Sequence, residues 1–337
     1  YRLHWYLHPY RDQCETITLI HDLGDDPIGD FPAYLDPSIK DLVGNGLEVK
    51  LWDVSAFKSV ENIFDSADLV LIWDANSTED DWISQTQFAE QIEPKICVRV
   101  DHISQRFAGS FYLKLADHFE PDASNYIKES NAVFKEIRDI CSADKGYIFG
   151  TGPNLSAARA HDFSDGTCIA CNSMVRNIDL LDRLQPSLIV IADPIFHAGP
   201  SRYAGTFRSE LVAALDRYDC FLIVPTRDYH IYRTFLPQRF HAKISGIPYK
   251  SIEEPNLDLD ADFYVSSTPN ILTLFLLPLA ATFFKEIYIA GCDGRPVDAD
   301  GYFWAHDSAS QINEEMNSIQ RAHPAFFEID YNDYYRE

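Results

Sequence analysis

The chain has 337 residues, and 46% of them are hydrophobic, which is enough to build two cores. A single core usually stops growing at about 250 to 300 residues, so we expect two domains. The 52 acidic residues outnumber the 28 Lys and Arg residues and give a formal net charge of −24. A surface this acidic repels phosphate backbones and anionic lipids, which argues against nucleic-acid binding and against a polybasic membrane patch. An anionic ligand then needs a local group of donors, such as a helix N-terminus or a few arginines.

The seven cysteines are an odd number and lie mostly within apolar runs. We therefore expect reduced, buried thiols, as in a cytoplasmic protein. The protein would lie in the cytoplasm or at the inner face of the cytoplasmic membrane. Cys168 and Cys171 have the spacing of metal ligands, but no second pair completes a zinc site. The longest apolar run, 271–284, is short for a membrane span and contains Pro278, so it predicts a buried helix.

The first part of the chain alternates short β-rich runs with amphipathic stretches. The β-rich runs are bounded by Gly, Asp, Asn or Pro. Strands separated by helices predict βαβ units and a parallel sheet covered on both faces. The predicted strands are 16–21, 47–53, 69–73 and 95–101, and the predicted helices are 32–44, 56–66 and 79–92.

The alternation restarts after a helix within 121–142. We place a domain boundary at the turn 143–146, which gives an N-terminal domain 1–143 and a C-terminal domain 144–337. Both are predicted to be α/β, Rossmann-like domains with parallel sheets. The predicted strands of the second domain are 147–150, 167–171, 188–192, 220–224, 286–290 and a weaker 263–266, and its helices are 155–161, 176–184, 206–217, 270–284 and 308–319.

The sharpest local signal is the turn Gly150-Thr151-Gly152-Pro153-Asn154, which follows the strand Tyr-Ile-Phe. Two glycines allow a tight turn and the close approach of a ligand, and proline suits the first position of a helix whose free N–H groups favour anions. The same strand-glycine-helix turn also occurs in α/β proteins that bind nothing there.

Further motifs follow this turn in a fixed order. Strands end at Cys171-Asn172-Ser173 and Ala192-Asp193-Pro194, Ser266-Ser267-Thr268 precedes an apolar helix, and Lys-Glu-Ile-Tyr-Ile-Ala-Gly-Cys-Asp-Gly ends at Gly294. This order and spacing resemble the bacterial sialyltransferases that use sugars activated by cytidine monophosphate (CMP). They also resemble the motility accessory proteins that attach nonulosonic acids to flagellin, and pterin diphosphokinase-like proteins. The resemblance covers residues 147 to about 310, and we see none for the N-terminal half.

The resemblance implies a donor site on the second domain. Its glycine turn would contact the nucleotide and phosphate, Asn172 the ribose or sugar, and 266–268 the cytosine and ribose. Arg295 and Tyr302 fall where the family places hydrogen-bond donors to the phosphate, although Arg295 also fits a solvated loop charge. The donor-binding residues implied are Gly150, Thr151, Gly152, Pro153, Asn154, Asn172, Ser173, Ser266, Ser267, Thr268, Asp293, Gly294, Arg295 and Tyr302.

His306 is the best match to the family's catalytic histidine, which takes the proton of the acceptor hydroxyl or contacts the phosphate. A histidine suits proton transfer near neutral pH. It follows the Gly-Cys-Asp turn sooner than in the sialyltransferases, and it would also fit a packing role beside Trp304.

Asp193 departs from the sialyltransferases, which carry a neutral residue at this strand end. A carboxylate next to an anomeric carbon that already bears a sugar carboxylate is unfavourable unless it takes part in the reaction. As a nucleophile it would give a covalent glycosyl-enzyme and retention of configuration. This is similar to the retaining transferases of 3-deoxy-D-manno-octulosonic acid (Kdo), which pair a sialyltransferase-like domain with a second Rossmann-like domain. The alternative is that Asp-Pro caps a turn.

An acid or base for the acceptor is also expected. Glu120 and His102 are the candidates on the acceptor side, although neither lies within a motif. Cations and aromatics in other strand-end loops are suited to hold a sugar carboxylate. These loops contain His197, Arg202, Tyr203, Arg227, Asp228, Tyr229 and His230.

No metal or other cofactor is expected. The alternating acids Asp258, Asp260 and Asp262 more often form a solvated turn than a cation site. A CMP-sugar also carries only one phosphate, so its transfer has less need of a metal ion.

We therefore expect a two-domain, GT-B-like glycosyltransferase. Its predicted substrates are a CMP-activated 2-keto-3-deoxy sugar acid, Kdo ahead of sialic acid, and a bacterial surface glycan of lipopolysaccharide or capsule type. The chain would act alone or within a larger polysaccharide-assembly enzyme. Three alternatives remain: an inverting sialyl- or nonulosonyl-transferase, a pterin diphosphokinase-like enzyme, and a non-catalytic nucleotide-binding module.

Overall fold

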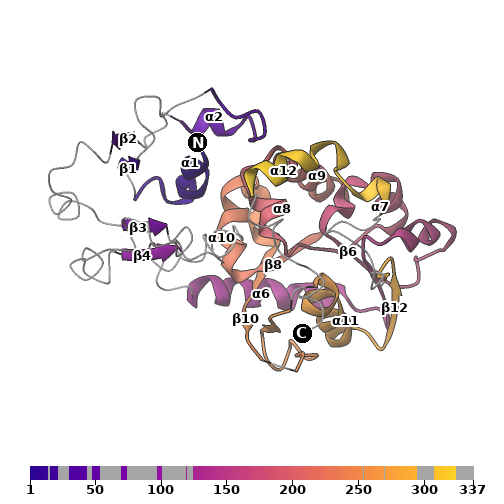
Figure 1. Cartoon of the computed structure of the whole chain (residues 1–337). Coiled ribbons are helices and arrows are strands. Elements are labelled where there is room, and N and C mark those ends of the chain that lie inside the picture. Colours follow the sequence, from indigo (N-terminus) through magenta and orange to yellow (C-terminus); the bar gives the residue numbers. More distant parts are fainter. Residues whose placement is uncertain are drawn as a thin grey trace.

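A six-stranded parallel sheet forms the centre of the protein in a computed structural model (Figure 1). The structure describes residues 1–13, 16–21, 30–43, 48–53, 70–73, 97–100, 119, 124–252, 254–268, 270–293 and 307–323. The strand order is β12-β5-β6-β7-β8-β9, and every neighbouring pair is parallel. The strands are β5 (Lys145–Phe149), β6 (Thr167–Cys171), β7 (Leu188–Val190), β8 (Phe221–Pro225), β9 (Ile244–Ile247) and β12 (Glu286–Ala290).

Helices flank the sheet, which explains why its central strands are almost entirely apolar and fully buried. Figure 1 shows α6 and α11 on one side of the sheet and α9 and α12 on the other. This α/β architecture is compatible with a Rossmann-like fold. The helices are α6 (Ser124–Ile140), α7 (Ile178–Leu184), α8 (Pro194–Ala198), α9 (Arg202–Tyr218), α10 (Thr226–Phe235), α11 (Leu277–Phe283) and α12 (Met316–Ala322).

Several elements differ from the sequence-based prediction. β9 was not predicted, and the expected strand 263–266 is only β11 (Val265–Ser266), which pairs with β10 (Tyr249–Lys250) in a separate two-stranded sheet. The expected helix 308–319 is wrong in its first two turns. There the chain forms two short 3-10 turns and becomes extended at Gln311 between them, so α12 begins only at residue 316.

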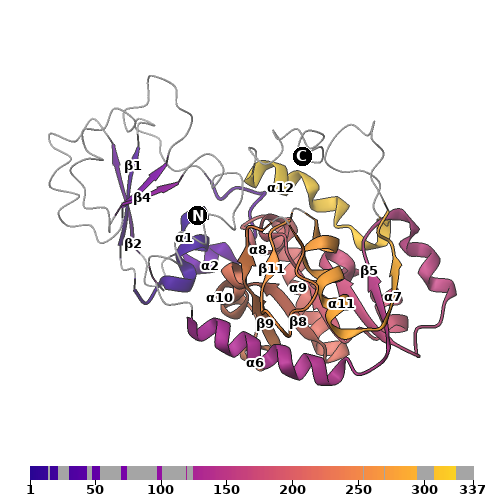
Figure 2. The same ribbon diagram turned by 90° about the horizontal axis from the view of Figure 1, so that it is seen from below.

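The predicted strands of the N-terminal part are confirmed. β1 (Thr16–His21) pairs with β2 (Glu48–Asp53), and β3 (Val70–Trp73) pairs with β4 (Cys97–Val100), both in parallel. Figure 2 shows these strands at one end of the molecule, beyond α1 (Arg2–Leu7) and α2 (Ile39–Leu42). α2 lies within the expected helix 32–44, whereas 56–66 and 79–92 lie outside the described residues.

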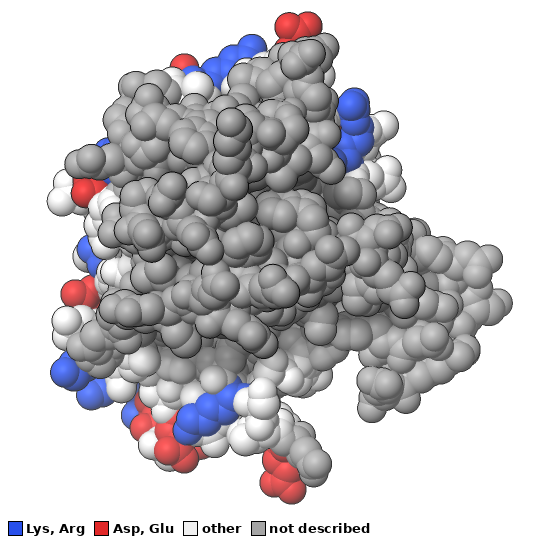
Figure 3. Space-filling model, turned by 60° about the vertical axis from the view of Figure 1, so that its left-hand side comes forward, with Lys and Arg blue, Asp and Glu red and all other residues white. Residues whose placement is uncertain are grey.

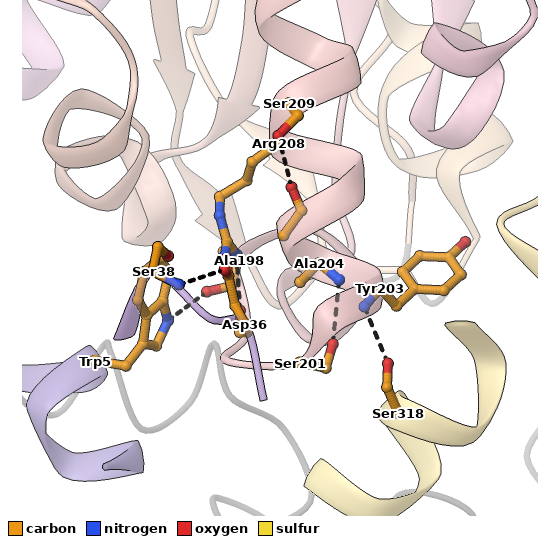
Figure 4. A network of polar contacts seen from close by, with 12 residues as sticks. Trp5, Asp36, Ser38, Ala198, Ser201, Tyr203, Ala204, Arg208, Ser209 and Ser318 are labelled. Carbon is orange, nitrogen blue, oxygen red and sulfur yellow. Dashed lines mark hydrogen bonds and ion pairs between the residues drawn. The ribbon is translucent and has the colours of Figure 1, made fainter. Parts of the chain in front are cut away.

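The first residues of the chain pack against helices α8 and α9 beside the six-stranded sheet through a buried network (Figure 4). The indole Nε1 of Trp5 donates to the carbonyl of Ala198 at 2.8 Å. The Arg208 guanidinium lies 4.2 Å from the Trp5 ring, donates to the carbonyl of Gly199 at 2.8 Å, and forms an ion pair with Asp36. Residues 1–10 and 35–39 therefore contribute to the same core as the six-stranded sheet.

Helix α6 also belongs to this packing unit, although the predicted boundary at 143 places it in the N-terminal domain. The Ser245 hydroxyl in β9 donates to the carbonyl of Ser130 at 2.9 Å, and the Gly246 amide donates to the Ser130 hydroxyl at 2.9 Å. These buried bonds fix the helix against the edge strand.

Charged side chains of both signs lie interspersed around the rim of the face shown in Figure 3. Several of the described charges are paired at the surface, as between Lys285 and Asp144 at 2.8 Å. Exposed pairs of this kind contribute little stability individually. Within the described ranges, no helix combines the length and the hydrophobicity needed to cross a bilayer.

Candidate functional site

The carboxyl ends of the parallel strands bring the candidate residues to one edge of the sheet. Gly150 follows β5, Asn172 follows β6, Asp193 lies after β7, Arg227 follows β8 and Asp293 lies after β12. Neighbouring strands are about 4.8 Å apart, so the residues after adjacent strands are close enough to face one ligand. The strand order reverses between β5 and β12, and such switch points are where open α/β sheets bind ligands.

The two glycine-containing turns at this switch point pack against each other. The Gly150 amide donates to the carbonyl of Ala290 at 2.9 Å, and the Gly152 amide donates to the carbonyl of Gly291 at 2.7 Å. A Cβ on Gly150 would lie 2.5 Å from the Gly291 oxygen, and Gly291 itself has a φ of 64°. Packing alone therefore explains why these positions are glycines, without a ligand, because no side chain fits between the two backbones.

Asp293 provides the anion that the glycine turn holds in this structure. Its carboxylate accepts a hydrogen bond from the Asn154 amide at 3.0 Å and a second from the Asn154 side chain. A Cβ on Gly152 would overlap Asp293 Oδ2. The helix that follows is a 3-10 helix, Pro153–Ala160, and its first amides are thus partly satisfied by the chain itself.

The segment that starts at Asp307 is fixed beside the same turn. The Asp307 amide donates to the carbonyl of Thr151 at 2.9 Å. The Asp307 carboxylate accepts from the Asn177 side chain at 3.1 Å and from the Ser310 hydroxyl at 2.9 Å. Asp307 directly follows the predicted catalytic His306 in the sequence. The predicted residues that lie outside the described ranges are His102, Glu120, Gly294, Arg295, Tyr302 and His306.

Asn172 connects the ends of β6 and β7. It has a φ of 47°, a left-handed conformation that asparagine tolerates better than most residues, and its Oδ1 accepts from the Ala192 amide at 3.4 Å. The next residue, Ser173, is buried. Asn172 thus supports the backbone immediately before Asp193.

Asp193 is half-buried at the end of β7 and is the N-cap of α8. Its Oδ1 accepts from the amides of Ile195 at 3.1 Å and Phe196 at 3.3 Å, so the capping role left open by the sequence is confirmed. No described residue donates a hydrogen bond to the other oxygen, Oδ2. Burial raises the pKa of Asp193 to about 6, although the two amides and the charge of Arg227 act in the opposite direction.

Arg227 and Asp228 form a charged pair at the end of the adjacent strand, β8. The Arg227 Nε lies 3.3 Å from Asp228 Oδ1, and the side chains are 24% and 1% exposed, respectively. The guanidinium carbon lies 5.2 Å from the centre of the Tyr249 ring. Burial raises the pKa of Asp228, and Arg227 opposes that shift. Sequence reasoning placed this pair at a strand end but had no signal for its burial.

The hydroxyl turn after β11 lies next to Tyr249, because β10 and β11 are paired. The Ser266 hydroxyl donates to the carbonyl of Glu254 at 2.7 Å, and the Thr268 hydroxyl lies 2.8 Å from that of Thr273. The Ser267 amide donates to the carbonyl of Lys250 at 2.9 Å. The turn is therefore on the β9 side of the edge, at the opposite end from the glycine turn.

Most of the other predicted strand-end residues point into packed surroundings. The His197 ring lies 4.1 Å from that of Phe207, and burial lowers its pKa to about 3, so it is neutral. His230 Nε2 lies 2.6 Å from the Tyr10 hydroxyl. The remaining pairs are Tyr203 with Gln311, Arg202 with Glu315, and Tyr229 with Glu129.

The acidic turn at 258–262 is held by its own bonds and by a surface ion pair. Asp258 Oδ1 accepts from the Ala261 amide at 3.1 Å, and Asp260 pairs with Arg138 at 2.6 Å. Among the residues that the structure describes, no group of three His, Cys, Asp or Glu side chains is placed to hold a metal ion. Cys168 and Cys171 are buried free thiols in β6, and burial raises the pKa of Cys168 to about 12.

No protein-family model matches the chain, and no curated protein or solved structure matches it either. Because a fold class alone does not specify an activity, function has to be argued from the chemistry of this edge of the sheet.

Proposed function

We propose that the protein is a glycosyltransferase that moves a 2-keto-3-deoxy sugar acid, Kdo in the first place, from CMP to a bacterial surface glycan with retention of configuration. The observation that carries this proposal is the state of Asp193. Two amides anchor one carboxylate oxygen, and no described residue donates to the other oxygen at the carboxyl edge of the sheet. With a pKa of about 6, the carboxylate is mostly ionised at neutral pH and more basic than an ordinary aspartate.

The chemistry follows from this position. Oδ2 of Asp193 attacks the anomeric carbon, the bond from that carbon to the phosphate oxygen breaks, and the electron pair leaves with CMP. The glycosyl ester formed on Asp193 is then attacked by an acceptor hydroxyl, whose proton passes to a base, and the carboxylate is released. His306 and Glu120 are our candidates for that base.

The arrangement of the edge is consistent with a bound nucleotide sugar. Asn172 follows β6, the strand next to that of Asp193, the 266–268 turn follows β11 in the separate small sheet, and the glycine turn lies at the switch point. We propose that CMP lies along this edge without a metal ion and that the N-terminal part of the chain faces the glycan in a GT-B-like arrangement. The reaction would take place in the cytoplasm or at the inner face of the cytoplasmic membrane.

The test is an Asp193→Asn variant. Asparagine caps a helix as well as aspartate does, so α8 should be kept while the nucleophile is lost. We expect release of CMP from CMP-Kdo to fall by at least about a thousandfold, as for other lost catalytic groups, while calorimetry shows unchanged CMP binding. Full transfer by Asp193→Asn, or a product of inverted anomeric configuration from the wild type, would exclude double displacement at this residue. Absence of CMP binding by the wild type would exclude the donor class.

A further inference from the structure

The Arg227 guanidinium is the least satisfied cation among the described residues at the carboxyl edge. Its only described ion pair is with Asp228, and its Nε makes no well-aligned hydrogen bond there. The buried oxygen Oδ1 of Asp228 also has no hydrogen-bond donor among the residues that the structure describes. A guanidinium carries five N–H donors, and leaving the buried Nε–H without a well-aligned acceptor is costly.

The surroundings fix which part of Arg227 is available. Asp228 lies at Nε, and the Tyr249 ring covers the guanidinium carbon. No described residue accepts a hydrogen bond from the two terminal nitrogens, Nη1 and Nη2. Such a pair of parallel donors matches the two oxygens of a carboxylate.

Two other described anion-binding groups at this edge are already occupied. Arg176 is paired with Glu210 at 3.1 Å and with Glu314 at 2.5 Å. The Asn154 amide beside the glycine turn holds the carboxylate of Asp293. Arg227 thus differs from these groups in having both a compensating charge and open donors.

The position of Arg227 next to Asp193 indicates which anion it takes. They follow neighbouring strands, β8 and β7, and their charges interact. In a 2-keto sugar acid the carboxyl carbon is bonded directly to the anomeric carbon, so a group that binds the carboxylate must lie close to the nucleophile. The leaving phosphate departs on the face opposite to the attack, away from Asp193. The geometry therefore favours the sugar carboxylate over the phosphate.

We propose that Arg227 binds the carboxylate of the donor sugar and thereby selects acidic sugars over neutral ones, an inference that rests on the function proposed above. Asp228 is a positioning residue that holds the guanidinium at Nε. The bound cation also reduces the repulsion between the sugar carboxylate and Asp193.

The experiment compares wild type, Arg227→Lys and Arg227→Gln by isothermal titration calorimetry. The probes are CMP, free Kdo, and Kdo with its carboxylate converted to the carboxamide. The matched control is Arg217→Lys on α9, which alters an exposed ion pair between Arg217 and Asp182. Thermal melts establish whether each variant is folded. If Arg227→Lys is unfolded, the comparison is made with Arg227→Gln.

In the wild type we expect Kdo to bind more tightly than its carboxamide. Both Arg227 variants should weaken Kdo binding by about 10- to 100-fold, as for loss of a charge-assisted pair, abolish the preference over the carboxamide and leave CMP affinity unchanged.

Lost CMP affinity with unchanged Kdo affinity would assign Arg227 to the phosphate and overturn the inference. Unchanged binding of all three probes would overturn it as well. If the wild type binds neither CMP nor Kdo, the proposed function fails and the inference with it. If Kdo binding depends on Arg227 but Asp193→Asn is active, only the double displacement fails.

Discussion

The carboxylate of Asp293 accepts a hydrogen bond from the backbone amide of Asn154 at 3.0 Å, across 139 residues of sequence. An acid of the chain itself therefore lies at the start of the 3-10 helix that follows the glycine turn, where the resemblance to CMP-sugar enzymes implies a phosphate. The contact joins the ends of β5 and β12 at the switch point of the sheet. It also explains why residue 152 is a glycine, because a Cβ there would overlap the Asp293 carboxylate.

We predict that Gly152 and Asp293 are energetically coupled. Gly152→Ala should destabilise the protein by about 2 kcal/mol, because the new methyl group would overlap Asp293 Oδ2. Asp293→Ala should cost about 1 to 2 kcal/mol through the lost bonds to Asn154. In the double variant the overlap with Oδ2 is gone, although the Gly291 carbonyl oxygen still lies 2.8 Å from the methyl position, so urea unfolding should show a loss smaller than the sum. Strictly additive losses would mean that the two residues do not contact each other.

The buried pair of Arg208 and Asp36 should contribute strongly to attachment of the N-terminal segment. Arg208→Met leaves Asp36, whose side chain is 14% exposed, without its counter-charge, and we expect a loss of about 3 kcal/mol in the free energy of unfolding. Arg217→Met is the control on the same helix, because its pair with Asp182 is exposed and should cost under about 1 kcal/mol. Equal losses in urea unfolding would contradict a special role for the buried pair.

Asp193 should make stability depend on pH in a defined direction. Its pKa is about 6 in the folded protein, against an ordinary value of 3.8, so the folded state binds the proton more tightly. The corresponding stability is fully present below pH 4 and is lost as the pH rises through 6. Relative to wild type, Asp193→Asn should become more stable between pH 4.5 and 7, by about 1 to 3 kcal/mol. A constant difference across that range would show that the pKa is not raised.

The same group should give the pH–rate profile an acidic limb. Only the ionised carboxylate is a nucleophile, so kcat/KM should rise to a plateau above about pH 6. The positive charge of Arg227 lowers the pKa of Asp193, so the limb should move to higher pH in Arg227→Gln. An unshifted limb would indicate that the two groups do not interact.

The strands could be predicted from sequence where burial on both faces makes nearly every residue apolar, as in β6 and β8. β9 was missed because Ile-Ser-Gly-Ile is short and includes two weak strand formers. The segment 308–319 has enough apolar residues for a helix, but Ser310 bonds to Asp307 and the chain turns there instead. Local polar contacts of this kind leave no periodic signal.

The strand-end positions of the site were likewise predictable, since parallel strands must share their carboxyl edge. Asp193 was identified in this way. The contacts of Asp293 with Asn154, and of Asp36 with Arg208, join residues more than 130 positions apart. Neither pairing follows from spacing or composition, because each depends on how separate elements pack. The burial of Asp228 was unpredictable for the same reason.

The most direct test is intact-protein mass spectrometry after incubation with CMP-Kdo in the absence of acceptor. We predict that wild-type protein gains the mass of one sugar-acid residue, that peptide mapping places it on Asp193, and that Asp193→Asn shows no such gain. Addition of an acceptor should remove the adduct as product forms. Sustained transfer by the wild type without any adduct, and with inverted anomeric configuration in the product, would contradict a covalent intermediate on Asp193.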